Sequence, residues 1–196
     1  AITISNNSIS TGVIQSANGN NVIDSTITIS GTALTRYQAD AGSTLTYAGS
    51  PAFAQATQTV VFQGAGNHTV PNGNNFIGTT GGLTKEGTGT LFMNGEKFTT
   101  GTTTITAGTL VLGANNRFAA GSLMSIAGTL NLNGFSQTVN GLTGAGTVTT
   151  TVAGACSLTI NNTATQTFSG TISNGSGTVG IRKLGTGDQT FSGGVS

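Results

Sequence analysis

Residues 81–113, GGLTKEGTGTLFMNGEKFTTGTTTITAGTLVLG, contain two short runs in which apolar residues recur at every second position. Leu91 and Met93 share one side of an extended chain, and Leu110 and Leu112 share one side of the later run. Alternation over four to eight residues, bounded by Gly and Asn, is typical of a half-buried β-strand. Nothing in this stretch follows the helical spacing of i, i+3 and i+4. It therefore predicts short strands separated by glycine-rich turns.

The same pattern recurs elsewhere in the chain. The first copy opens at Gly82 and a second, GIRKLGTGDQTFSG, opens at Gly180, with its lysine and its Gly-Thr-Gly at the same relative positions. Residues 41–47 and 127–132 resemble the strand that opens with AGTL in the first copy. Evenly spaced short strands are found in sandwiches and in solenoids, and internal repetition favours the solenoid. One coil cannot bury its apolar face alone, but stacked coils form apolar ladders along the axis.

The run LTKEGTGTL at residues 83–91, followed by Gly95, Phe98, Gly101, Thr103, Ile105 and the GTLVL of residues 108–112, resembles the passenger-associated transport repeat of bacterial autotransporter passengers. The resemblance implies an all-β, right-handed parallel β-helix at a bacterial cell surface. It implies no particular chemistry, because the repeat is scaffold. Two departures stand out: Lys97 lies near where the family usually has Asn, and the second copy stops at Ser196. We expect residues 1–196 to form a single β-solenoid that is incomplete at both ends.

The composition excludes several classes of protein. Glycine accounts for 32 of 196 residues, charged residues for only 6%, and the formal net charge is +1. Such a chain lacks the basic patch of a nucleic-acid-binding protein. It contains no apolar run of the ~18 residues that a membrane-spanning helix requires, so no such helix is expected. It starts at Ala1 rather than Met, which fits a processed secreted protein or a piece of a longer chain equally well.

The alternation also predicts which side chains face the core. The expected core ladder consists of Leu110, Leu112, Leu130, Leu132, Leu158 and Ile160. Val111 and Asn131 lie between these residues and are expected to point outward. Cys156 is the sole cysteine and alternates with Leu158 and Ile160, so we expect it to face the core, with an intermolecular disulfide as the alternative. The aromatic residues, including Tyr37 and Tyr47, are expected to fill the ladders.

Catalytic and metal-binding chemistry is not expected. The carboxylates are dispersed along the chain, and stacking of coils brings at most Asp24 toward Asp40; they are Asp24, Asp40, Glu86, Glu96 and Asp188. His68 has no second His or Cys as a partner and is interpreted as a turn residue. Residues 175–180 match G-x-G-x-x-G, but a strand follows them where a dinucleotide site needs a helix. The GTGD of residues 185–188 lacks the spacing of calcium-binding nonapeptides. We therefore expect no enzyme, cofactor or metal.

Three functions remain open at this stage. The first is an extracellular structural or adhesive protein in which the solenoid itself serves as a rod, spacer or fibre. The second is a module that binds carbohydrate or a host surface through the loops 64–75 and 114–122, although the chain has no Trp. The third is a polysaccharide-acting enzyme, which the scattered acids disfavour. Four glycosylation sequons, at Asn6, Asn67, Asn161 and Asn174, are expected by chance in so Asn- and Thr-rich a chain.

The two ends of the predicted solenoid suggest how it assembles. Ile2 and Ile4 are already strand-like, and Phe191 and Val195 belong to a repeat that stops halfway. Neither end shows the polar cap that soluble solenoids usually carry. The chain is therefore expected either to continue into the rest of a longer passenger or to stack head to tail with other copies. Stacking of that kind does not close and gives a filament.

Overall fold

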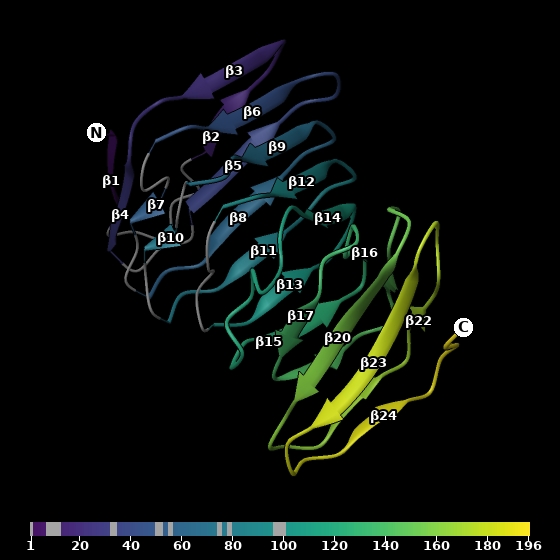
Figure 1. The fold of residues 1–196 in the computed structure, drawn as a ribbon. Coiled ribbons are helices and arrows are strands. Elements are labelled where there is room, and N and C mark those ends of the chain that lie inside the picture. The colour runs from purple at the N-terminus through teal and green to yellow at the C-terminus, as the bar shows by residue number, and fades with distance from the viewer. Residues whose placement is uncertain are drawn as a thin grey trace.

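The computed structural model describes residues 2–6, 13–31, 35–49, 53–54, 57–73, 76–77, 80–95 and 101–196. Every regular element within these ranges is a β-strand, and they contain no helix. All pairings between the strands are parallel, and the chain winds from one end of the stack to the other (Figure 1). The molecule is thus a parallel β-solenoid, which confirms the predicted fold class.

The N-terminal coils contribute strands to three sheets in turn, whereas the middle coils contribute described strands to the second and third sheets only. The first sheet comprises β1 (Ile2–Asn6), β4 (Ile27–Gly31), β7 (Phe53–Ala54) and β10 (Phe76–Ile77). The second comprises β2 (Val13–Ser16), β5 (Thr35–Ala39), β8 (Val60–Gln63), β11 (Leu83–Lys85), β13 (Thr103–Ile105), β15 (Leu123–Ile126) and β18 (Gly141–Thr143). The third comprises β3 (Asn20–Ile23), β6 (Thr44–Tyr47), β9 (Asn67–Val70), β12 (Thr90–Met93), β14 (Thr109–Leu112), β16 (Thr129–Asn131), β19 (Thr147–Thr149) and β22 (Thr171–Ile172).

The C-terminal coils continue this order in two smaller sheets. One, with β17 (Gln137–Val139), β20 (Ala155–Asn161) and β23 (Thr178–Leu184), holds the place of the first sheet in chain order. The other pairs β21 (Gln166–Phe168) with β24 (Gln189–Phe191). A parallel bridge between Gly144 and Phe168 links this pair to the second sheet.

The register shows that the coils differ in length. Ile2 lies against Ile27 near the N-terminus, whereas Leu123 lies against Gly141 in a later coil, which is several residues shorter. The strands stay in register, so the segments between them absorb the difference. The two AGTL strands stack directly, with Leu110 against Leu130.

Apolar ladders run along the axis of the solenoid. In the third sheet one ladder passes through Leu91, Leu110, Leu130 and Val148, all fully buried. Every residue of the expected core ladder is 0% exposed: Leu110, Leu112, Leu130, Leu132, Leu158 and Ile160. Cys156 is 4% exposed and belongs to the same cluster, so it faces the core.

Val111 and Asn131, which are expected to point outward, are shielded from solvent. They lie outside the core cluster but are only 9% and 7% exposed. The Asn131 amide donates to Thr151 Oγ1 at 2.8 Å, and its oxygen accepts from the Asn133 backbone N–H at 2.9 Å. Thr151 and Asn133, which follow β19 and β16, contact the Asn131 side chain, so an outward position in this sheet is not necessarily exposed.

The corner between the second and third sheets brings successive coils into close contact. Gly87 has φ +70°, and a Cβ at Gly89 would lie 1.8 Å from the carbonyl oxygen of Gly66 in the preceding coil. Only glycine fits such an approach. The Gly-Thr-Gly of the motif therefore marks a tight coil-on-coil contact.

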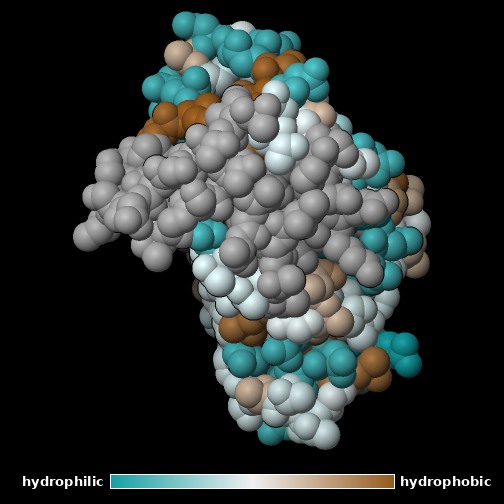
Figure 2. Space-filling model, turned by 90° about the vertical axis from the view of Figure 1, so that its left-hand side faces the viewer, coloured by the Kyte–Doolittle hydropathy of each residue, from teal (hydrophilic) through white to brown (hydrophobic). Residues whose placement is uncertain are grey.

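The predicted assembly residues lie near the two ends of the stack. Ile2 and Ile4 lie in β1, which pairs with β4. Phe191, in β24, is partly buried against the core, whereas Val195 is 55% exposed and bridges to Ile172. On the face seen in Figure 2, the C-terminal coils carry mainly hydrophilic and near-neutral residues with isolated hydrophobic ones. No helix in the described ranges is long and apolar enough to cross a membrane.

Candidate functional site

Polar side chains form a connected row on the outer side of the second sheet. Arg36 Nη1 donates to Glu86 Oε2 at 2.6 Å and to Gln63 Oε1 at 3.0 Å. Gln63 donates to Gln38 at 3.0 Å, and Gln38 donates to Asp40 at 2.6 Å. The polar groups of the row are hydrogen-bonded to one another, and several of these bonds link neighbouring coils. The row therefore holds the coils together and leaves its polar groups occupied rather than open to a ligand.

The carboxylates do not converge. Asp40 follows β5 and accepts amide donors from Gln15 at 2.7 Å and from Gln38. Asp24 follows β3 and so lies at a different corner from Asp40, contrary to the proximity considered from the sequence. Glu96 lies outside the described residues. Within the ranges that the structure describes, no three His, Cys, Asp or Glu side chains gather as metal ligands would.

His68 lies in the core, not in a turn as expected. It occupies β9 and is 0% exposed. Nε2 is 2.9 Å from the Gln63 carbonyl oxygen, so Nε2 carries the proton and Nδ1 accepts the Tyr47 hydroxyl, also at 2.9 Å. Tyr47 stacks on the imidazole, and Phe62 meets it edge-on at 5.3 Å between ring centroids.

The protonation states of this cluster follow from its burial. Burial lowers the pKa of His68 to about 4; the hydrogen bond to the Gln63 carbonyl opposes the shift and the nearby Lys85 charge adds to it. Burial also holds the pKa of Tyr47 well above its usual value. Both side chains are therefore neutral at pH 7, and the imidazole serves as a packed structural element.

Lys85 is a buried cation, although a lysine in isolation indicates an exposed position. It alternates with Leu83 on β11, faces inward and is 0% exposed. Its ammonium donates to the carbonyl oxygens of Glu86 at 2.6 Å and Gly87 at 2.8 Å. Glu86 and Gly87 are the first two residues of the corner that follows β11. Burial lowers its pKa to about 8, against the pull of the Glu86 carboxylate. Its inward position in the alternation was the signal for its burial.

Concave regions that suit a ligand include two among the described residues. A groove of about 520 Å³ follows the corner between the second and third sheets and is lined by Thr, Ala and Gly of successive coils, such as Thr106, Gly128 and Thr147. A second hollow of about 440 Å³ lies beside Phe118 and Thr138. Neither is lined by a charged side chain. Both suit neutral polar contacts better than acid–base chemistry.

The two loops expected to carry ligands are parts of the solenoid. Residues 64–75 contain β9. In residues 114–122, Phe118 is 4% exposed and Arg117 Nη1 donates to the Gly95 carbonyl oxygen at 2.8 Å. The second segment thus packs onto the preceding coil.

Comparison with known proteins agrees with the motif. Residues 83–119 match the family model described as the passenger-associated-transport-repeat. An alignment 132 residues long, which covers 59% of this chain, shows 37% identity to the Adhesin BmaC autotransporter of Brucella suis biovar 1 (strain 1330). The chain spans only 4% of that relative. No solved structure matches. The resemblance drawn from the residues is therefore confirmed by both matches.

Proposed function

We propose that this chain is a rod-like segment of an autotransporter passenger and takes part in adhesion at the bacterial cell surface. The observation that carries the proposal is the match of the motif corner to the passenger repeat in a chain whose described strands stack in parallel, coil upon coil. The similarity to an autotransporter adhesin supports both the extracellular location and the adhesive role.

The chemistry of the surface supports a non-enzymatic role. The polar row on the second sheet is occupied by its own hydrogen bonds, which include those accepted by Glu86 and Asp40. Adhesion needs only a stable, elongated surface that presents repeated side chains. A parallel stack provides this, because each coil adds ~4.8 Å of length and repeats the same outer positions.

Carbohydrate is the second candidate ligand. The corner groove presents threonine hydroxyls from successive coils, including Thr88, Thr109 and Thr129, and hydroxyl-rich grooves suit sugar hydroxyls. The groove has no aromatic side chain among its lining residues, which leaves a sugar without a stacking surface.

An adhesion assay tests the proposal. Beads coated with the intact chain should bind cultured mammalian cells in a saturable manner, and soluble chain should compete. Beads coated with an unrelated β-solenoid of similar charge serve as the control. Equal retention of both kinds of bead would remove the adhesive role. Enzymatic removal of cell-surface glycans separates the candidates, since only carbohydrate recognition would be lost.

A further inference from the structure

The chain contains six Asn-Gly pairs, each of which can lose ammonia from its asparagine. The glycine nitrogen attacks the side-chain amide carbon Cγ, an N–Cγ bond forms, and the bond from Cγ to the amide nitrogen breaks. The glycine N–H proton passes through water to the leaving nitrogen, which departs as ammonia. Water then opens the succinimide ring and leaves aspartate or isoaspartate. The pairs begin at Asn18, Asn72, Asn94, Asn133, Asn140 and Asn174.

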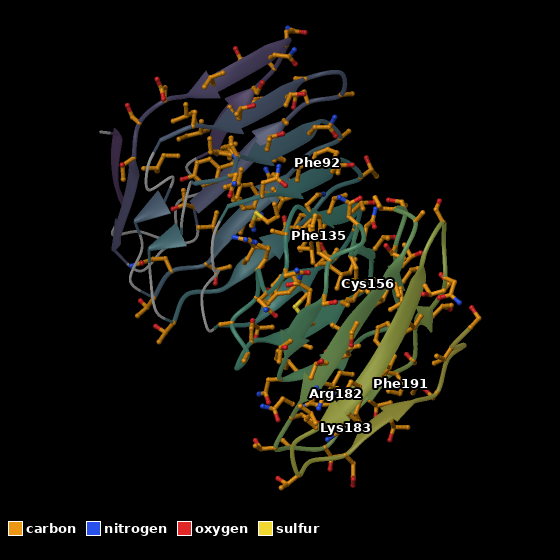
Figure 3. The ribbon with its side chains drawn as sticks, in the orientation of Figure 1. Phe92, Phe135, Cys156, Arg182, Lys183 and Phe191 are labelled. Carbon is orange, nitrogen blue, oxygen red and sulfur yellow. The ribbon has the colours of Figure 1, made fainter. Side chains whose placement is uncertain are left out.

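The pair at Asn133 is held firmly by the solenoid. Asn133 Nδ2 donates to the Leu112 carbonyl oxygen of the preceding coil at 3.0 Å, and Gly134 N–H donates to Thr150 Oγ1 of the next coil at 2.8 Å. Phe135, the next residue, is half-buried beside the middle coils (Figure 3). The two reacting groups are therefore tied to different coils, and ring closure would break both hydrogen bonds.

Three further pairs are also held or covered. Gly175 N–H donates to the Gly177 carbonyl oxygen at 3.1 Å, and Asn174 Oδ1 accepts the Val179 N–H at 2.8 Å. Both reacting groups of this pair are engaged with other partners. The glycines of the other two pairs are buried away from water: Gly95 and Gly141.

The pair at Asn18 is exposed, but its peptide group is fixed in a turn. The Asn18 carbonyl oxygen accepts from Asn21 Nδ2 at 2.8 Å, and the Gly19 carbonyl oxygen accepts the Thr44 N–H at 3.0 Å. Ring closure rotates the peptide that joins Asn18 to Gly19, so it would break the bond to Asn21. Exposure alone is therefore not sufficient for the reaction.

The pair Asn72–Gly73 combines exposure with a suitable geometry. Both residues are exposed, at the corner that follows β9 (Figure 1). Gly73 N–H donates to the Asn72 side-chain oxygen Oδ1 at 3.1 Å, so the attacking nitrogen already lies beside the amide carbon that it attacks. Contact between the reacting atoms is what an intramolecular reaction needs. A Cβ at Gly73 would meet nothing within 4 Å, so no neighbouring group covers the glycine.

From this contrast we infer that Asn72 is a site of spontaneous deamidation, at which the folded chain is converted to aspartate and isoaspartate. The product replaces a neutral amide by a carboxylate and so cancels the formal net charge of +1. Isoaspartate adds one atom to the backbone at a corner. Because coils of this solenoid already differ in length between strands that stay in register, the corner accommodates that atom. This inference does not rest on adhesion.

Incubation of the intact chain in mildly alkaline buffer tests the inference. Digestion and mass spectrometry then measure Asn, Asp and isoAsp at each pair. In the folded chain Asn72 should convert at least about tenfold faster than Asn133, since two hydrogen bonds must break at Asn133. In urea the fold no longer distinguishes the pairs, so all should convert within about twofold of one another.

Asn72→Gln is the matched variant, because glutamine would have to close a larger ring. On isoelectric focusing the natural chain should gain an acidic band with time, and the variant should not gain it over the same period. Thermal unfolding of the aged and fresh chains should coincide. The inference is overturned if Asn72 stays intact in the folded chain while the chain in urea converts. It is also overturned if Asn18 or Asn133 converts as fast as Asn72 in the folded chain, or if the aged chain unfolds at a lower temperature.

Discussion

His68 should make the stability of the solenoid depend on pH. Its pKa is about 4 in the folded chain and about 6.5 when unfolded, so below pH 6.5 the unfolded chain binds a proton that the folded chain does not. Stability should be constant above that pH with respect to His68 and fall by ~3 kcal/mol between pH 6.5 and 4. Urea unfolding at a series of pH values measures this.

His68→Gln is the control for that series. The amide does not titrate, so the difference between the two unfolding curves isolates the imidazole from the carboxylates that titrate at lower pH. Parallel pH profiles for the two proteins would show that His68 is accessible to protons and that its burial contributes nothing to the pH dependence.

Gly108 should tolerate no side chain. It has φ +65°, and a Cβ would lie 2.3 Å from the Gly89 carbonyl oxygen. We expect Gly108→Ala to destabilise the protein by about 3 kcal/mol in chemical unfolding, through backbone strain and steric overlap. Gly121 is the matched control, because a Cβ there meets nothing within 4 Å. If Gly108→Ala and Gly121→Ala unfold at the same denaturant concentration, the corner is looser than described.

Along a single strand, the two faces should differ in their sensitivity to mutation. Leu130 is 0% exposed in β16, while Thr129 beside it is half-buried on the outer face. Leu130→Ala should cost ~2–5 kcal/mol because it leaves a cavity in the ladder. Thr129→Ala should cost less than about 1 kcal/mol, as is usual for surface positions. Equal losses in thermal unfolding would mean that the inward and outward registers are exchanged.

The strands of the motif were predictable because local alternation decides them. In β14 and β16 the period-2 pattern alone distinguishes the core residues Leu110 and Leu130 from Val111 and Asn131, which follow them in the two strands. The cover over Asn131 was not predictable, because it depends on Thr151 in the next coil. The burial of Lys85 was predictable only in part: its place in the alternation indicates an inward side chain, but Gly108 of the next coil lies over the ammonium and completes its burial.

The spacing of the two motif copies indicated the fold class, but it did not indicate in which sheet each copy lies. The copies that open at Gly82 and Gly180 fall in different sheets, since β11 lies in the second sheet and β23 lies with β17 and β20. The coils differ in length, as the pairs Ile2–Ile27 and Leu123–Gly141 show, so a residue spacing alone does not give a number of coils. Each sequence repeat in this chain specifies the local conformation of a corner. The stacking of the coils decides after which sheet that corner lies.

Across the whole molecule, the hydrogen bonds between coils run parallel to the long axis. A pulling force applied between the two ends would load these bonds one rung at a time, because the outermost coil must peel away before the next is strained. Each detached coil of roughly 20 residues would release about 60–70 Å of chain and remove only ~4.8 Å of rod. A solenoid loaded in this way yields in many small steps under tension.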